Sequence, residues 1–375
     1  MPLFADPRIL MRKVVIIIII LWFLSARISI DSTQGINSTN SNPATHIGDS
    51  CTIFTATISD RVLFGNNEDY RLWGIYAWFI PAQAIWTPSG SHTTYGAIFF
   101  GFDDNGDQAD GYPQGGMNDQ GLCIDGNALS DYSIHDHPER DTPYCAMMAQ
   151  ILWECATVEE VVTWYQTHRI GTSMPYQLHF ADATGDAVVV SPGDDNEIAF
   201  TRIQTNTCLV STNINVADST RDVFDCWRYS TAMLMLTAIS SESALTVEAC
   251  RDVLDAVHQN GLYATKYSNV FDCVSRDIYL WYDRDYTITA TMNLDTELAA
   301  VQPGAPGYTE SLTLYHAVAD DGTLHYRKIA LTDFFTPPPP PLTLYLIITI
   351  GGTIAIIVII SSVVLIRRKQ KAKIV

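Results

Sequence analysis

The segment CTIFTATISDRVLFGNNED, residues 51–69, carries the clearest structural signal in this chain of 375 residues. Its β-branched and aromatic residues predict a strand over Thr52–Ile58, followed by a turn at 59–61. The strand pattern resumes at 62–64, until Gly65-Asn66-Asn67 interrupts it. A sheet is therefore expected to begin directly after Cys51.

Working outward from this hairpin, residues 51–335 are expected to form one domain. Helical periodicity occurs at 144–156, 158–168, 225–238 and 246–259. Thr157, with Glu160 three residues later, is typical of a capping box. Further short strands are expected at 78–80, 95–100, 121–124, 176–180, 187–190, 207–211, 278–282, 286–293, 312–316 and 323–329. Strands followed by helices and then by strands indicate an α+β domain of layered sheets and helices.

The N-terminal flank has the pattern of an export signal. Basic residues Arg8, Arg12 and Lys13 precede an uncharged apolar run over 14–26. This run is shorter than the ~20 residues of an ordinary membrane span, so a signal peptide over 1–30 is expected. An uncleaved anchor is the alternative. Residues 31–50 are polar and poor in apolar side chains, which predicts a flexible leader or propeptide.

The C-terminal flank predicts a transmembrane helix. Residues 342–366 are apolar and uncharged, a run long enough to cross about 30 Å of hydrocarbon. The basic segment 367–375 follows at once and indicates a cytoplasmic end. The proline-rich segment 336–341 predicts a stiff linker. The expected protein is thus a single-pass protein of the cell membrane, with an extracellular domain and a cytoplasmic C-terminus.

Charge and motif content exclude several functions. The chain has 22 basic and 41 acidic residues, a net charge of −19, which argues against nucleic acid as a partner. Such a surface favours cationic or neutral partners, or reflects adaptation to salt. The acidic run 103–107 lacks the glycine and the final carboxylate of a calcium loop, since Gln108 and Gln114 stand there. Eight cysteines show no CxxC spacing, so we expect no metal and no cofactor.

Cys51 is the candidate nucleophile. If the leader is removed, this residue carries a thiol and a free α-amine, with ordinary pKa values of ~8.5 and ~7.7–8.0. The amine can then accept the thiol proton near neutral pH, so that one residue supplies both nucleophile and general base. If the leader stays, Cys51 is a structural residue or half of a disulfide.

Several further motifs follow Cys51-Thr52 and the FGNNED segment in a fixed order. They are QGGMNDQGL at 114–122, DGN at 125–127, ADATG at 181–185, STN at 211–213, CWRY at 226–229 and YSNVFD at 267–272. Together they resemble the N-terminal nucleophile (Ntn) hydrolases of the choloylglycine hydrolase family of linear amide C–N hydrolases. That family includes penicillin V acylase and isopenicillin N acyltransferase-like enzymes. The resemblance spans most of the domain and implies a four-layer αββα sandwich of two antiparallel sheets flanked by helices.

The resemblance also implies catalytic roles. Cys51 would be the nucleophile, exposed by removal of the preceding residues. Asp69 would accept hydrogen bonds from its amine. Asn127 and Asn213 match the amides that form the oxyanion hole and orient the amine. Arg228 matches an arginine that orders the site around the thiol.

One position departs from the family pattern. Asn66 stands where bile salt hydrolases carry an arginine, so the fixed positive charge that would lower the thiol pKa is missing there. Either Arg228 or Arg71 compensates, or the thiol depends on its own amine. The substitution puts bile-salt specificity in doubt. Asn66, Asn67 and Trp73 are the candidate substrate-binding residues.

The expected function is that of a membrane-tethered extracellular amidohydrolase. It would cleave a linear, non-peptide C–N bond of a small acyl-amide through a Cys51 acyl-thioester. Two alternatives remain open: an acyltransferase of the isopenicillin N acyltransferase type, and an inactive ectodomain that binds a ligand. The acyl and amine groups, the mechanism of leader removal, the disulfide pairing and the presence of a homo-oligomer are not determined by the sequence.

Overall fold

The computed structural model describes residues 51–71, 74–102, 112–204, 207–220, 222–311, 313–320 and 322–335. The expected signal peptide, leader, proline linker, transmembrane helix and basic tail lie outside these residues. Within the described ranges, no helix is both long and apolar enough to cross a membrane.

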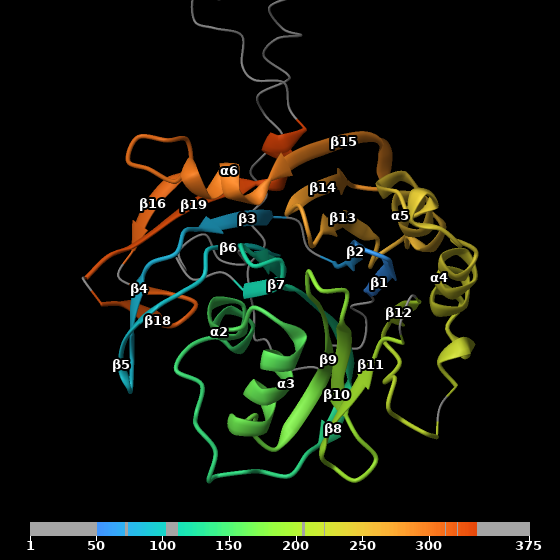
Figure 1. Ribbon diagram of the computed structural model, residues 1–375, viewed down its shortest axis with the longest axis horizontal. Coiled ribbons are helices and arrows are strands. Elements are labelled where there is room, and N and C mark those ends of the chain that lie inside the picture. Colours follow the sequence, from blue (N-terminus) through green and yellow to red (C-terminus); the bar gives the residue numbers. More distant parts are fainter. Residues whose placement is uncertain are drawn as a thin grey trace, which may run out of the picture. The chain divides into compact units, whose positions relative to one another are not determined.

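The described strands form three sheets, and neighbouring strands in each are antiparallel (Figure 1). The first sheet has the order β12 (Cys208–Ser211), β1 (Thr52–Ile58), β2 (Arg61–Asp69), β13 (Thr265–Asp272), β14 (Asp277–Tyr282) and β15 (Asp285–Asn293). The second has the order β11 (Ile198–Arg202), β10 (Ala187–Pro192), β9 (Ser173–Ala181), β8 (Cys123–Ser133), β7 (Tyr112–Asn118), β6 (Ala97–Phe102), β3 (Ile75–Ile80), β19 (Leu324–Ala330) and β16 (Tyr308–Ser311). A small third sheet, which the sequence did not predict, has the order β17 (Thr313–Leu314), β18 (Ala317–Ala319), β4 (Ala84–Thr87) and β5 (Gly90–Thr93).

The described helices lie on the outer faces of the two large sheets, except the last of them, which packs against the core between the sheets. They are α2 (Met147–Glu154), α3 (Val158–Thr167), α4 (Trp227–Thr237), α5 (Val247–Val257) and α6 (Leu294–Ala299), with short 3₁₀ turns η1 (Val223–Asp225), η2 (Glu242–Ala244) and η3 (Leu331–Phe334). Phe54 and Leu63 of the first sheet pack against α4 and α5, whereas Phe64 packs toward the second sheet. Phe99 and Ile124 of the second sheet pack against α2 and α3. The expected α+β class, with two antiparallel sheets flanked by helices, is confirmed.

Strand β2 is longer than the sequence predicted. Gly65-Asn66-Asn67 was expected to end it, but the strand continues to Asp69. It is an inner strand that pairs with β1 on one side and β13 on the other, so its backbone groups are bonded along both edges. That pairing outweighs the low strand propensity of glycine and asparagine. Because side chains alternate along a strand, Asn66 and Glu68 share the face of Phe64 between the sheets.

A second expectation was also wrong. Residues 312–316 were predicted to form a strand, but β17 covers only Thr313–Leu314. Tyr315 and His316 have φ values of 51° and 67°, in the left-handed region, so the chain turns there instead of extending. The expected capping box of α3 is confirmed, because Thr157 accepts a hydrogen bond from the Glu160 backbone and the Glu160 side chain bonds back.

Candidate active site

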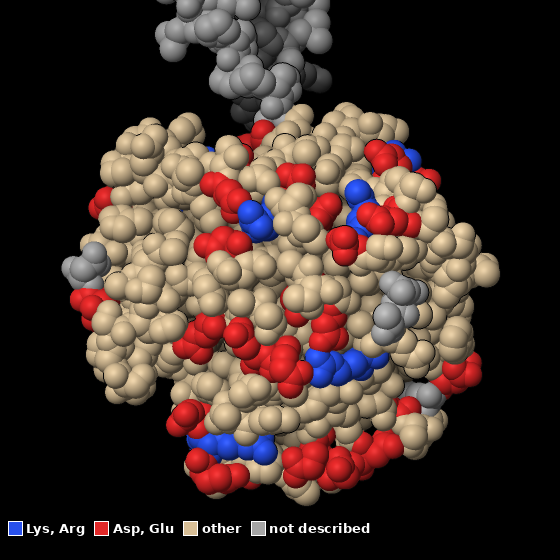
Figure 2. Space-filling view, viewed as in Figure 1, with Lys and Arg blue, Asp and Glu red and all other residues tan. Residues whose placement is uncertain are grey.

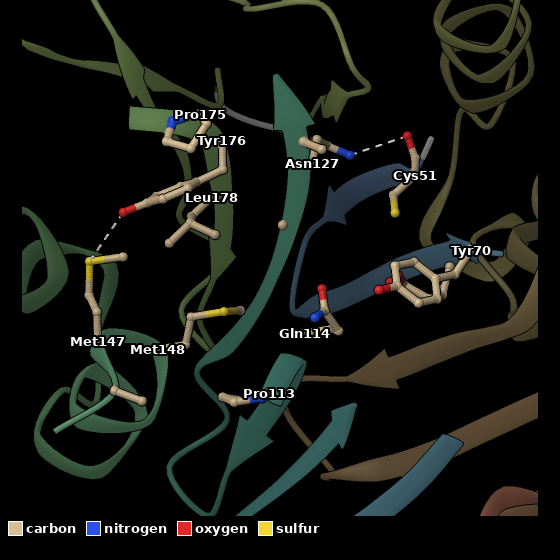
Figure 3. Close-up of a pocket in the computed structure, with 14 residues that line it drawn as sticks. Cys51, Tyr70, Pro113, Gln114, Asn127, Met147, Met148, Pro175, Tyr176 and Leu178 are labelled. Atoms are coloured by element: carbon tan, nitrogen blue, oxygen red, sulfur yellow. Dashed lines mark hydrogen bonds between the residues drawn. The ribbon is translucent and has the colours of Figure 1, made fainter. Parts of the chain in front are cut away.

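A cavity of about 450 Å³ opens beside the start of β1 (Figure 3). One end is formed by Cys51, by Glu68 and Tyr70 from the end of β2, and by Gln114 and Asn127 from β7 and β8. The opposite wall is apolar, with Met147, Met148, Tyr176 and Leu178 among its residues. The cavity therefore joins a polar end, which holds a thiol, to an apolar wall.

Cys51 is buried, with 4% of its surface exposed, and its Sγ points into the cavity (Figure 3). Burial raises the pKa of this thiol well above its ordinary value, and the negative charges of Glu68, Asp69 and Asp125 raise it further. A hydrogen bond from the Asp69 backbone opposes these effects only in part. With its backbone nitrogen still joined to Ser50, Cys51 therefore carries a protonated, weakly nucleophilic thiol.

The main chain of Cys51 is held by two side chains. Asn127 Nδ2 donates to its carbonyl oxygen at 3.2 Å, and Arg228 Nη1 donates to the same oxygen at 2.6 Å. Arg228, in the first turn of α4, also donates from Nη1 to Thr52 Oγ1 and from Nη2 to Asn213 Oδ1, both at 2.9 Å. A planar guanidinium can bind several acceptors in fixed directions, so Arg228 fixes the start of β1 against Asn213.

Asp69 completes this group on the α5 side of β2. Its Oδ2 lies 3.8 Å from Arg228 Nη1 and accepts a hydrogen bond from Gln259 Nε2 at 2.9 Å, while Thr265 Oγ1 donates to Oδ1. Complete burial raises the pKa of Asp69 to about 7, although Thr265, Gln259 and Arg228 each act to lower it. Contacts centred on Arg228 thus connect Cys51, Asp69, Asn127 and Asn213.

Comparison with known proteins gives a fold likeness only. No family model and no curated protein matches the sequence. Among solved structures, penicillin V acylase from Agrobacterium tumefaciens is similar at 18% identity and a TM-score of 0.47, covering 62% of this chain and 82% of that chain. Two variants of the conjugated bile acid hydrolase from Clostridium perfringens are similar at 17% identity, with TM-scores of 0.46 and 0.45, each covering 66% of this chain and 93% of that chain. At these values, the function has to be inferred from the site itself.

Neither Asn66 nor Asn67, two of the candidate substrate-binding residues, is among the described residues that line the cavity. Asn66 is fully buried opposite Asn269, and its amide has no hydrogen-bond partner among the described residues. Asn67 faces α5, where its Nδ2 donates to Leu254 O at 2.8 Å. Trp73 lies outside the described residues. Among the described aromatic residues between positions 70 and 86, Tyr70 lines the cavity.

Two acidic residues near the thiol were not singled out from the sequence. Glu68, at 2% exposure, lines the cavity, and Asp125, at 1%, lies opposite Gly115 in the pairing of β7 and β8. A methyl group added to Gly115 would collide with the Asp125 carboxylate, so this glycine makes room for a buried acid. The glycine pair at 115–116 was the available signal, since glycine inside a strand often marks a close approach.

Asp69 predicts a specific pH dependence. Because its folded pKa of about 7 exceeds the ordinary value of 3.8, the folded chain holds a proton that the unfolded chain releases between these values. The free energy of unfolding of the unprocessed chain should therefore fall as pH rises through that window, by at most about 1.4 kcal/mol per pH unit from this group. Urea unfolding at about pH 5 and pH 7 should show a smaller fall in Asp69→Asn. The matched change at exposed Asp252, Asp252→Asn, should keep the wild-type fall, and an Asp69→Asn variant that also keeps it would contradict the assignment.

Proposed function

We propose that this chain is an amidohydrolase of the Ntn type that cleaves linear, non-peptide C–N bonds with Cys51 as its nucleophile. The strongest support is the placement of Cys51, whose Sγ points into the cavity while its carbonyl is held by Asn127 and Arg228. The ordered motifs along the chain are consistent with this assignment.

Removal of residues 1–50 would convert the Cys51 backbone nitrogen into an amine. The described residues that line the cavity include no histidine or lysine, and this amine belongs to the same residue as the thiol, so it is the best-placed general base. Asp69 lies close to Arg228, which also binds the Cys51 carbonyl, so a carboxylate is available near the new ammonium. The ammonium would favour the ionised form of Asp69 and so offset its burial.

The reaction then follows from these groups. The amine takes the thiol proton, and Sγ attacks the substrate carbonyl carbon to form a C–S bond. Asn127 Nδ2 is suited to donate to the oxyanion, an interaction whose loss typically costs about 2.7–4 kcal/mol. The ammonium returns the proton to the leaving nitrogen as the C–N bond breaks. Water, deprotonated by the same amine, attacks the thioester, and the acid leaves as the C–S bond breaks.

Two alternatives differ from this proposal in defined ways. An acyltransferase would share every step up to the thioester and then use an amine or alcohol in place of water. A ligand-binding ectodomain would need no free Cys51 amine, and Asn66, at the position of the family's arginine, is its best support. Export and tethering through 342–366 remain part of the proposal, because they follow from the sequence pattern alone.

The N-terminus of the native protein tests the proposal. Intact-mass measurement and N-terminal sequencing of the protein from its own membrane are expected to find Cys51 as the first residue. A thiol-reactive probe should label Cys51 in this processed form and leave it unlabelled in the precursor, where burial and nearby carboxylates raise its pKa. A fully active protein that still begins upstream of Cys51 would contradict the mechanism.

A further inference from the structure

Two cysteines from different sheets are in contact in the core of the domain. Cys123 begins β8 of the second sheet, and Cys273 follows directly after β13 of the first sheet. Their Sγ atoms are 3.5 Å apart, and both side chains are completely buried between the sheets. The two residues are 150 positions apart in the sequence, so it is the fold that brings these thiols together.

The main chain holds each of these cysteines in place. Cys123 is paired with Met117 of β7 on one side and with Ala181 of β9 on the other. The backbone nitrogen of Cys273 donates to Val62 O at 3.1 Å. Because hydrogen-bonded strands fix both backbones, the contact between the two sulfur atoms is a property of the packed sheets.

The turn before β8 allows the two sheets to approach each other closely at this point. Gly121, in this turn, has a φ of 86°, in the region that favours glycine. A methyl group added to Gly121 would lie 2.1 Å from Cys273 O, so a side chain here would push the two backbones apart. Glycine at this position therefore helps to bring Cys123 within reach of Cys273.

Three other buried cysteines lie in different parts of the domain. Cys155 packs with α2 and α3 on the outer face of the second sheet, and Cys250 packs with α4 and α5 on the outer face of the first. Cys51 lines the cavity. Cys123 and Cys273, in contrast, share the core cluster between the sheets.

We propose that Cys123 and Cys273 form a disulfide bond that links the two large sheets in the exported protein. Two sulfur atoms in contact become bonded when they approach to about 2.05 Å, a movement on the scale of a side-chain rotation. Disulfides form and persist outside the cytoplasm, so the presence of this bond in the native protein rests on the export proposed above. It does not depend on the amidohydrolase function.

The oxidant for this step is an external disulfide, such as glutathione disulfide or the active-site disulfide of an oxidoreductase. The thiolate of one cysteine attacks a sulfur of that disulfide and displaces one thiol. The second cysteine attacks the mixed disulfide, forms the Cys123–Cys273 bond and displaces the other thiol. Two cysteines are oxidised, one external disulfide is reduced, and the two cysteine protons end on the two released thiols. Because the folded pair is completely buried, this exchange takes place while the chain folds.

The bond would stabilise a chain with a large excess of negative charge. Acidic side chains are more frequent than basic ones on the face seen in Figure 2, and the whole chain has a net charge of −19. Repulsion among such charges destabilises the compact state. A cross-link opposes this effect by restricting the unfolded chain, here by closing a loop over residues 123–273.

A count of free thiols tests for the bond. The protein from its own membrane is unfolded in urea and alkylated, with and without prior reduction, and its mass is then measured. Of the eight cysteines, two should resist alkylation until the protein is reduced. A digest prepared without reduction should contain two peptides joined through Cys123 and Cys273, and reduction should separate them.

Substitutions identify the two cysteines independently. Cys123→Ala removes one cysteine but frees its partner, so the number of thiols alkylated without reduction should rise by one. Cys123→Ala combined with Cys273→Ala should leave that number unchanged. The matched pair, Cys155→Ala combined with Cys250→Ala, removes two buried thiols elsewhere and should lower it by two. Reductant should lower the urea midpoint of wild type and of the matched pair, but not that of the pair that lacks Cys123 and Cys273.

Refolding separates failure of this site from failure of the proposed export. The reduced protein, refolded from urea with glutathione disulfide, should form the same peptide link. If all thiols of the native protein are free but the refolded protein forms the bond, the site stands and the proposed export is wrong. If neither protein forms it, or if the joined peptides contain other cysteines, the inference is overturned. Neither measurement requires amide hydrolysis, so these outcomes leave the amidohydrolase proposal unchanged.

Discussion

Replacing Cys51 with alanine is expected to lower kcat/KM toward an acyl-amide by about 10⁴-fold or more, to the level of the uncatalysed reaction. The change removes the sulfur of the proposed nucleophile, and the described residues that line the cavity contain no other cysteine and no serine or threonine to replace it. Cys51→Ser keeps the amine and supplies a weaker nucleophile, so it should retain more activity than Cys51→Ala. Release of the amine product, followed by chromatography, measures all three proteins.

The intact mass of each protein has to accompany these rates. The mass of the unreacted protein shows whether leader removal also depends on the thiol. After incubation with a slowly hydrolysed substrate, the mass of the wild-type protein should increase by one acyl group, and that of Cys51→Ala should not. Cys208→Ala is the matched control, because Cys208 is a half-buried thiol beside Met233 of α4 and does not line the cavity. It should retain wild-type turnover and acylation. Residual turnover of Cys51→Ala well above background would remove Cys51 from the mechanism.

The order of short motifs along the chain was enough to nominate Cys51, Asp69, Asn127, Asn213 and Arg228, which the fold connects through hydrogen bonds and one ion pair. Strand propensities could not nominate Glu68. Glycine and asparagine in GNNED suggested the end of a strand, whereas pairing of β2 with both β1 and β13 carries that strand to Asp69. Only this continuation places Glu68 on the cavity side and Asn67 on the α5 side.

The apolar wall shows a different limit. Met147 and Met148 belong to an apolar run that predicted a helix, and the helix is present as α2. Which of its residues line a cavity depends on how α2 packs against β9, which contributes Tyr176 and Leu178 to the same wall. This is a tertiary contact between segments about 30 residues apart, and no periodicity within either segment reports it. Fold class was therefore accessible from sequence patterns, which also nominated the proposed nucleophile, whereas the lining of the pocket required the three-dimensional arrangement.

Replacing Arg228 with leucine is expected to lower the free energy of unfolding by about 3–5 kcal/mol. The side chain is 6% exposed, and its loss leaves Cys51 O, Thr52 Oγ1 and Asn213 Oδ1 without their charged donor. It also removes the cation that lowers the pKa of buried Asp69, so the loss should be larger above pH 7, where that carboxyl ionises, than near pH 5. Urea unfolding at the two pH values measures both effects.

Arg228→Lys and Arg251→Leu distinguish a loss of charge from a loss of geometry. Lysine keeps the positive charge but cannot bind three acceptors from one plane, so Arg228→Lys should recover part of the stability while kcat/KM stays low, because Cys51 is no longer held in position. Arg251→Leu breaks an ion pair with Asp252 at the surface of α5 and should cost at most about 1 kcal/mol. If Arg228→Leu proves as stable and as active as Arg251→Leu, the guanidinium does not hold the start of β1. The positioning of Cys51 would then have to depend on Asn127, whose amide donates to the same carbonyl oxygen.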